Sequence, residues 1–172
     1  AADVSPLTAV LRRRPLIWDN LFANDYDLRR LYLGPYAGRP TSLRAATAGV
    51  LLNPNCEFEA NRLPIDTFAS WVTRENYDPA RAHAQAREAW RSDWRCLDSG
   101  GAATPLPADL FALLCDCLHL PFTYGPRAEA WRQDIAAAVQ GDLAAVARAR
   151  EGGEQLATLF EQLTRLEDRE LL

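Results

Sequence analysis

The sequence predicts a mainly α-helical single domain, an irregular bundle of five to seven helices that spans residues 1–172. Apolar residues recur at spacings of three and four through residues 63–172, which is typical of helices with one buried face. Proline, glycine and Asp–Pro pairs interrupt that region at short intervals, as helix boundaries do. A chain of this length buries a sizeable core, so we expect folding without a disulfide or a structural metal.

The helices of residues 63–172 are each expected to start at a recognisable signal. They are expected to begin after Pro64, at Pro79 behind the N-cap Asp78, at Pro107, at Pro126, at Asp142 and after Gly152–Gly153. The second helix is expected to reach residue 97, with His83, Trp90 and Trp94 on its buried stripe. The segment DSGGAATP (98–105) is predicted to be a loop.

Residues 1–62 form a less regular N-terminal subregion. Residues 15–22 are expected to add a short helix, while residues 25–33 suit either a helix or a strand that ends at Gly34–Pro35. The stretch GVLLNPNCEFEANRL (49–63) alternates like a β-hairpin turning at Asn53–Asn55. The expected result is a helical body that carries either no sheet or a small N-terminal β-hairpin or three-strand ribbon.

In that hairpin, the segment CEFEA would place Cys56 and Phe58 inward and Glu57 and Glu59 outward. Paired carboxylates on one strand face can perform acid–base chemistry or bind a cation. A solvated strand face accounts for them equally directly, and it is the interpretation we adopt.

The composition excludes several chemistries. All 19 basic residues are arginine, which excludes Schiff-base lysines, a P-loop lysine and a lysine general base. The net charge is −4, and the excess of arginine in residues 1–50 is small, so a nucleic-acid partner is not favoured. The arginine-only, alanine-rich composition is typical of a GC-rich bacterial genome. No run of 18 apolar residues and no signal peptide is present, and the four cysteines have no regular spacing, so we expect a cytoplasmic protein with reduced cysteines and no membrane contact.

The segment LLCDCLHL (113–120) resembles a metal site at first reading. On a helix, however, Cys115 and Cys117 lie about 200° apart and cannot share one ion. Cys115 and His119 are four residues apart and share a face, which makes them the candidate metal ligands. A structural role in the core is the favoured interpretation, and we expect no cofactor.

No nucleophile, base and orienting acid fall in a recognisable pattern, so whether the chain is an enzyme stays open, and we expect no catalytic residues. The favoured function is a non-catalytic protein- or peptide-binding partner: a chaperone, an adaptor, an immunity-type inhibitor, or an accessory subunit that presents a peptide to an enzyme. A peptide would pair with an exposed strand edge of CEFEA or RLYLG within a hetero-complex. The expected partner-binding residues are Arg29, Arg30, Tyr32, Arg39, Phe58, Trp90 and Trp94.

Two alternatives remain open. The first is a metal-binding protein or metalloenzyme that uses Cys115 and His119. The second is a nucleic-acid-associated regulatory protein that uses the arginine-rich N-terminal part.

Overall fold

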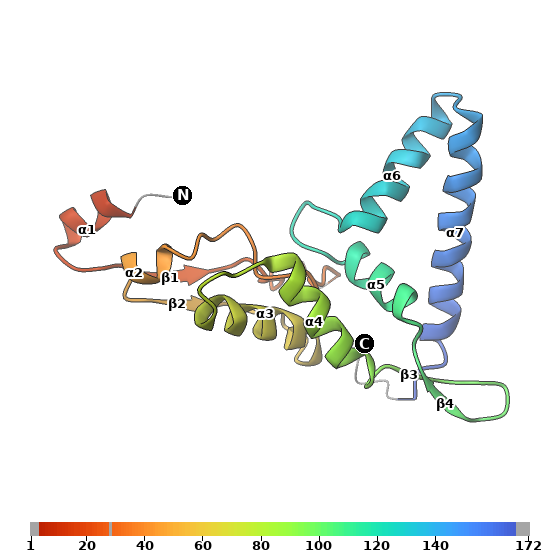
Figure 1. Cartoon of the computed structure of the whole chain (residues 1–172), viewed down its shortest axis with the longest axis horizontal. Coiled ribbons are helices and arrows are strands. Elements are labelled where there is room, and N and C mark those ends of the chain that lie inside the picture. Colours follow the sequence, from red (N-terminus) through yellow and green to blue (C-terminus); the bar gives the residue numbers. More distant parts are fainter. Residues whose placement is uncertain (1–3, 28, 168–172) are drawn as a thin grey trace.

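The computed structural model describes residues 4–27 and 29–167, and within them the chain is mainly α-helical with short strands, as predicted (Figure 1). The helices are α1 (Ser5–Leu11), α2 (Leu43–Ala46), α3 (Arg62–Thr73), α4 (Pro79–Arg91), α5 (Ala108–Cys117), α6 (Pro126–Val139) and α7 (Leu143–Leu163). The strands are β1 (Leu16–Asp19), β2 (Gly49–Leu52), β3 (Arg95–Leu97) and β4 (Ala103–Pro105), and a 3-10 turn, η1, covers Glu59–Asn61. None of the helices in the described part has the length and apolar character needed to cross a membrane.

The N-terminal strands pair in parallel, and the predicted hairpin is wrong. β1 lies beside β2 in the register Leu16↔Gly49 to Asp19↔Leu52, and α2 belongs to the connection between them. The expected helix over residues 15–22 is therefore replaced by a strand. The segment CEFEA leads into the 3-10 turn, so Phe58 stays 85% exposed and Cys56 is exposed as well.

The second predicted helix ends earlier than expected. α4 stops at Arg91, and the chain turns into the antiparallel pair β3–β4. The segment DSGGAATP, predicted to be a loop throughout, supplies the turn and its last three residues form β4. In the turn, Gly101 adopts a φ of 81° that favours glycine. The backbone N–H of Leu97 also donates to the carbonyl of Arg165, so the end of the chain is held against β3.

The main core lies between α4, α5 and the C-terminal end of α7. Trp90, Trp94 and Phe111 form its aromatic centre, with the two indole rings 5.2 Å apart in an edge-to-face arrangement. Both tryptophans are 1% exposed. They therefore pack in the protein's own interior and are not available to a partner in this structure.

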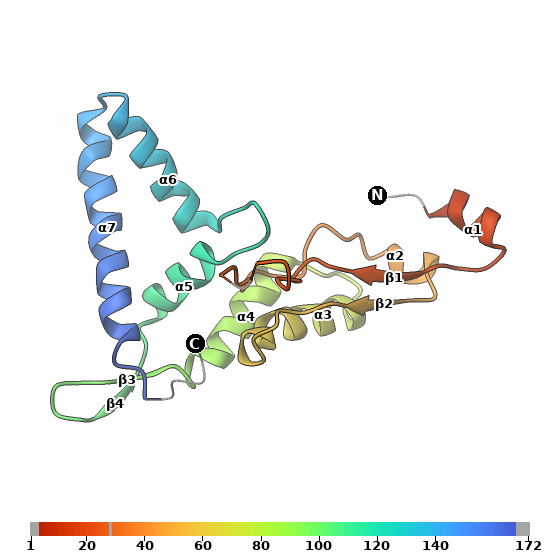
Figure 2. The ribbon, with the colours of Figure 1, turned by 180° about the vertical axis from the view of Figure 1, so that it is seen from behind.

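α6 and α7 form an antiparallel hairpin that extends away from β1 and β2, as the two opposite views agree (Figures 1 and 2). The predicted helix break at Gly152–Gly153 is wrong, because α7 runs through both glycines without interruption. The Trp131 ring of α6 lies where a Cβ atom on Gly152 would be. Gly152 thus allows the two helices to approach closely, and the Trp131 indole donates to the Ala149 carbonyl at 2.8 Å.

Candidate functional site

Polar side chains gather where β1 and β2 end. Trp18 is on β1, Asn20 follows that strand directly, and Asn53 follows β2. The ladder continues past the strands, because the backbone N–H of Asn53 donates to the Asp19 carbonyl at 2.8 Å. The carboxyl ends of parallel strands are the usual place for ligand sites in α/β proteins. These three residues are therefore the candidate site, which we call the strand-end site.

The three side chains of the strand-end site form one hydrogen-bonded unit. The indole N–H of Trp18 donates to Oδ1 of Asn20 at 2.7 Å, and Nδ2 of Asn53 donates to the same oxygen at 3.1 Å. The amide nitrogen of Asn20 and the amide oxygen of Asn53 have no hydrogen-bond partner within residues 4–27 and 29–167. Trp18 is 65% exposed. The unit thus offers the free amide nitrogen of Asn20, the free amide oxygen of Asn53 and an aromatic ring to a ligand.

Asp19 fixes this unit from the opposite face of β1. Its buried carboxylate accepts hydrogen bonds from Tyr36 Oη at 2.8 Å and from Arg39 Nε at 2.8 Å and Nη2 at 2.6 Å. Burial acts to raise the pKa of Asp19, but the hydrogen bonds from Arg39 and Tyr36 outweigh it and the pKa is lowered. Asp19 is therefore a charged anchor and not a proton donor at neutral pH.

Two buried asparagines, Asn24 and Asn55, connect the loops that follow β1 and β2 through hydrogen bonds. Nδ2 of Asn24 donates to the Arg30 carbonyl and to Oε2 of Glu57, both at 2.6 Å, and its Oδ1 accepts from the Cys56 N–H. Asn55 makes two further hydrogen bonds to the backbone of Tyr32. The two carboxylates predicted to share one strand face therefore have separate roles. Glu57 accepts a hydrogen bond from Asn24, whereas Glu59 begins η1.

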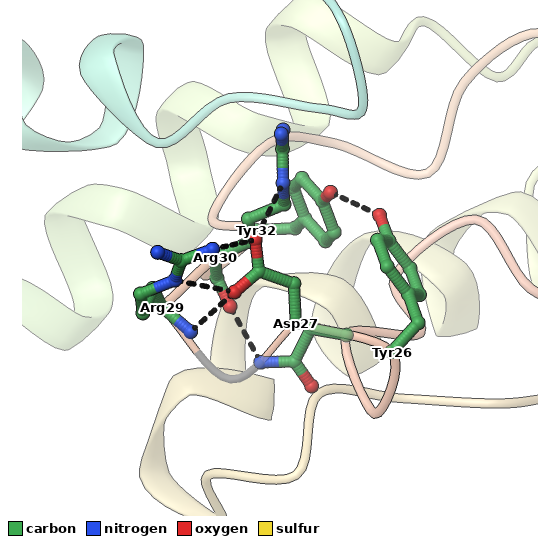
Figure 3. Close-up of polar contacts among 6 residues, drawn as sticks. Tyr26, Asp27, Arg29, Arg30 and Tyr32 are labelled. Carbon is green, nitrogen blue, oxygen red and sulfur yellow. Dashed lines mark hydrogen bonds and ion pairs between the residues drawn. The ribbon is translucent and has the colours of Figure 1, made fainter.

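In the loop after β1, Arg29 and Arg30 both bind the carboxylate of Asp27 (Figure 3). Asp27 binds Arg29 through Nε at 2.9 Å and Nη2 at 3.2 Å, and it also binds Arg30 through Nε at 3.3 Å. These contacts, led by the Arg29 hydrogen bond, lower the pKa of Asp27 to about 2. Beside them, the hydroxyls of Tyr26 and Tyr32 lie 2.5 Å apart. Both arginines thus already have an acidic partner inside the chain.

The predicted partner-binding residues do not form one surface. Arg29 and Arg30 are exposed, while the Tyr32 side chain packs in the interior at 5% exposure. Arg39 is committed to Asp19, and Phe58 projects from the loop after β2. A role of Arg29, Arg30 and Phe58 in contacting other molecules stays a prediction.

The predicted metal pair is separated by the end of α5. The helix ends at Cys117, so His119 lies beyond it and the spacing of four residues no longer defines a shared face. Cys115 is fully buried, and burial raises the pKa of its thiol to about 12, whereas a metal ligand must be a thiolate. No group of three His, Cys, Asp or Glu side chains within the described ranges is placed to hold a metal ion.

Sequence reasoning missed the strand-end site. The sequence pattern places Trp18 and Asn20 inside the short helix expected over residues 15–22, and Asn53 in the turn of the expected hairpin. The available signal was a short apolar segment followed at once by polar residues, which occurs twice, in LIWDN and VLLNPN. Without the parallel pairing of β1 and β2, nothing indicated that the two segments end side by side.

Comparisons with known proteins agree on one enzyme family. Residues 1–100 match the profile of the family described as NAGidase, beta-N-acetylglucosaminidase. The chain is 54% identical over 69 residues to the Protein O-GlcNAcase of Rattus norvegicus and, equally, to that of Mus musculus. Each match covers 40% of this chain and 8% of the relative, so the chain spans a small part of these proteins.

Two solved structures share the fold over nearly the whole chain. A mutant O-GlcNAc hydrolase of Thermobaculum terrenum matches with a TM-score of 0.68 and 21% identity, over 96% of this chain and 35% of that one. The structure of CpGH84B matches with a TM-score of 0.69 and 18% identity, over 99% of this chain and 29% of that one. These likenesses show the arrangement of the elements alone.

The comparisons overturn the functional prediction. The chain was expected to be a non-catalytic chaperone, adaptor, inhibitor or accessory subunit that binds a peptide, with metal-binding and nucleic-acid-associated proteins as alternatives. The family match and the curated relatives are glycoside hydrolases instead. The prediction was wrong because it relied on the lack of a catalytic pattern in the sequence, and a site made of amide and indole groups forms no such pattern.

Proposed function

Because the chain belongs to the β-N-acetylglucosaminidase family, we propose that it forms a sugar-binding part of a glycoside hydrolase active site. The observation that carries this proposal is the strand-end site, in which Trp18, Asn20 and Asn53 form one hydrogen-bonded unit beside the ends of two parallel strands. The substrate is a β-linked N-acetylglucosamine. The names of the rat and mouse relatives support a sugar attached to protein.

The strand-end site has the groups that a pyranose ring requires. The exposed indole of Trp18 offers an apolar face with a polar edge, and sugar sites combine such surfaces with a few placed polar groups. The free amide nitrogen of Asn20 donates to a sugar hydroxyl oxygen, and the free amide oxygen of Asn53 accepts from a hydroxyl.

The hydrolytic step needs a carboxylic acid that holds its proton and a second carboxyl group nearby. The carboxyl groups with a perturbed pKa in the described ranges all shift downward: Asp19, Asp27, Glu88 and Glu129. None of these four is suited to donate a proton at neutral pH. We therefore assign the hydrolytic step to none of these four carboxyl groups, and we assign to this chain the orientation of the sugar.

The test follows the Trp18 indole N–H signal of the full-length protein by NMR during titration with N-acetylglucosamine. We expect a saturable shift of that signal, because the indole borders the sugar. Asn20→Ala and Asn53→Ala each weaken binding about tenfold through the loss of one hydrogen bond and the loosening of the unit. Phe160→Ala, which removes an aromatic ring of similar exposure (60%) on α7, leaves binding unchanged.

Unchanged affinity in both asparagine variants contradicts the proposed site. Circular dichroism spectra of all variants, matched to the parent protein, exclude unfolding as the cause of weaker binding.

A further inference from the structure

A second hollow lies apart from the strand-end site, at the junction of three segments. It has a volume of about 510 Å³ and is lined by the Pro35–Ala37 segment, by α4, and by the end of α5 with the start of α6. Both views place the α5–α6 connection over the loop that follows β1 (Figures 1 and 2). The Leu33 N–H donates to the Leu118 carbonyl there at 2.6 Å. The volume suits a small organic ligand.

Arg87 of α4 enters this hollow with its hydrogen-bonding capacity unused. Its side chain is 25% exposed, and its nearest acidic atom, Oδ1 of Asp116, lies 3.8 Å from Nη1, beyond hydrogen-bond distance. No hydrogen bond from the guanidinium to any described residue is present. A guanidinium carries five N–H donors in a fork that fits carboxylate and phosphate groups. The Arg87 guanidinium is therefore a largely desolvated cation whose N–H groups lack hydrogen-bond acceptors among the described residues.

His119 lines the same hollow and is also incompletely partnered. Its Nδ1 atom is buried and lacks a hydrogen-bond partner among the residues described. His83, whose ring centre lies 6.0 Å away, uses Nε2 to contact the Leu33 carbonyl at 2.7 Å. Burial lowers the pKa of His83 to about 4 and also lowers the pKa of His119, so both rings are neutral at pH 7. A neutral His119 protonated on Nδ1 supplies one further donor.

The charges around the hollow favour an anion. Arg87 and Arg127 contribute two positive charges and Asp116 one negative charge. Asp116 is already engaged, because its Oδ2 accepts the Arg127 backbone N–H at 2.9 Å and so caps the start of α6. Arg127 directs Nη1 to the Asp109 carbonyl at 3.0 Å. Arg87 has only the long ion pair with Asp116, at 3.8 Å, so the described carboxylates leave one positive charge of the hollow uncompensated.

We propose that this hollow binds a small oxyanion, a phosphate or carboxylate group, between Arg87 and His119. The ligand's oxygens accept from the guanidinium fork, and a rotation of the His119 ring turns Nδ1, which is buried in this structure, toward them. This site is independent of the proposed sugar site, because it shares none of the residues of the strand-end site.

The test titrates the full-length protein with inorganic phosphate and, separately, with acetate. Total ionic strength is held constant with chloride, since surface charges respond to salt in general. Backbone NMR signals around residues 83–87 and 116–127 report binding. We expect saturable shifts confined to these segments, with the dissociation constant raised about tenfold or more by Arg87→Gln because charged hydrogen bonds are lost. Arg81→Gln, an exposed arginine on the same helix, changes it by less than about twofold.

Two further variants keep the proposal testable if Arg87→Gln fails to fold. Arg87→Lys retains the charge but lacks the fork, so weaker binding supports the assignment and parent-like binding contradicts it. Asp116→Asn removes the competing negative charge and should tighten binding several-fold. Phosphate and acetate distinguish the two ligand classes by their relative affinities. Shifts spread over exposed arginines, or unsaturable shifts with both anions, overturn the proposal.

Discussion

At the scale of single residues, the Asp19–Arg39 pair anchors the candidate site. Asp19 is the last residue of β1, with Trp18 before it and Asn20 directly after the strand, and its side chain is 4% exposed. Arg39 reaches it with two guanidinium nitrogens and also bonds the Ala37 carbonyl. The position of the two outward side chains therefore depends on a buried charge on the inward side of the same strand.

Replacing Arg39 by Gln should destabilise the fold by about 2–4 kcal/mol, because the Asp19 carboxylate stays buried without its cation. Urea unfolding followed by circular dichroism measures the change. Arg13→Gln, at an exposed arginine that forms no hydrogen bond or ion pair with the described residues, serves as control and should change stability by less than about 0.5 kcal/mol. Equal effects of the two variants would contradict the anchoring role.

The buried imidazole of His83 predicts a loss of stability on mild acidification. Burial lowers its pKa in the folded state to about 4, from 6.5, so the unfolded chain binds more protons between these values. Stability is therefore full above pH 6.5 and falls as the pH drops toward 4. We expect His83 to account for a loss of about 2 kcal/mol between pH 7 and pH 5.

Urea unfolding at the two pH values measures this loss, and His83→Gln should reduce it. A parent-like loss in the variant would assign the pH dependence to other groups. Asp19 adds a separate loss at lower pH: its folded pKa lies below 3.8, so its stabilisation is present above that value and disappears as the pH falls through the folded pKa.

The burial of single residues was predictable from the sequence only where it depended on their spacing within one helix. The buried His83 and Trp90 followed from their helical spacing, and the structure places both in the interior. The roles of Trp18, Asn20 and Asn53 depend on two segments more than thirty residues apart lying side by side. That relation is a tertiary one, and local patterns do not contain it.

At the scale of the elements, two adjacent glycines in α7 have opposite roles. Gly152 faces the Trp131 ring, whereas a Cβ atom on Gly153 would meet nothing within 4 Å. Gly152→Ala should destabilise the hairpin by about 1–3 kcal/mol through overpacking. Gly153→Ala should stabilise it by about 0.5–1 kcal/mol, since alanine is the better helix former. Thermal unfolding measures both, and shifts of the same sign would contradict the close approach of α6 and α7.

Helix starts were easier to predict than helix ends and strand partners. Asp78 caps α4 through the Arg81 N–H, and Asp142 caps α7 through two N–H groups, both at the predicted positions. The glycine pair gave a false stop in α7, because Gly152 is there for the close approach of Trp131 and a glycine inside a helix costs only about 1 kcal/mol relative to alanine. A parallel strand pair has no turn signal of its own, so residues 49–63 resembled a hairpin.

At the scale of the whole molecule, a pair of backbone hydrogen bonds joins the loop after β1 to the segment that follows α5. The N–H groups of Leu33 and Gly34 donate to the carbonyls of Leu118 and His119, both at 2.6 Å. A Cβ atom on Gly34 would overlap the His119 carbonyl. The LGPY segment, predicted to end a strand or helix, thus meets the end of LLCDCLHL. The single-domain organisation over residues 1–172 stays a prediction.

Gly34→Ala should therefore weaken this junction, with a loss of about 2 kcal/mol or more because backbone on both sides must shift. Gly100→Ala, at an exposed turn with ordinary contact distances, is the control and should change stability by less than about 0.5 kcal/mol. Urea unfolding and hydrogen exchange at residues 118–119 measure the effect. Full exchange protection at those residues in Gly34→Ala would contradict the role of this contact.

The measurement that tests the central claim most directly is the rate of hydrolysis of an aryl N-acetyl-β-glucosaminide by the full-length protein. Asn20→Ala and Asn53→Ala should each lower kcat/KM by about tenfold or more through lost sugar contacts, and Phe160→Ala should leave it unchanged. Parent-like kcat/KM in both asparagine variants would show that the ends of β1 and β2 do not hold the sugar.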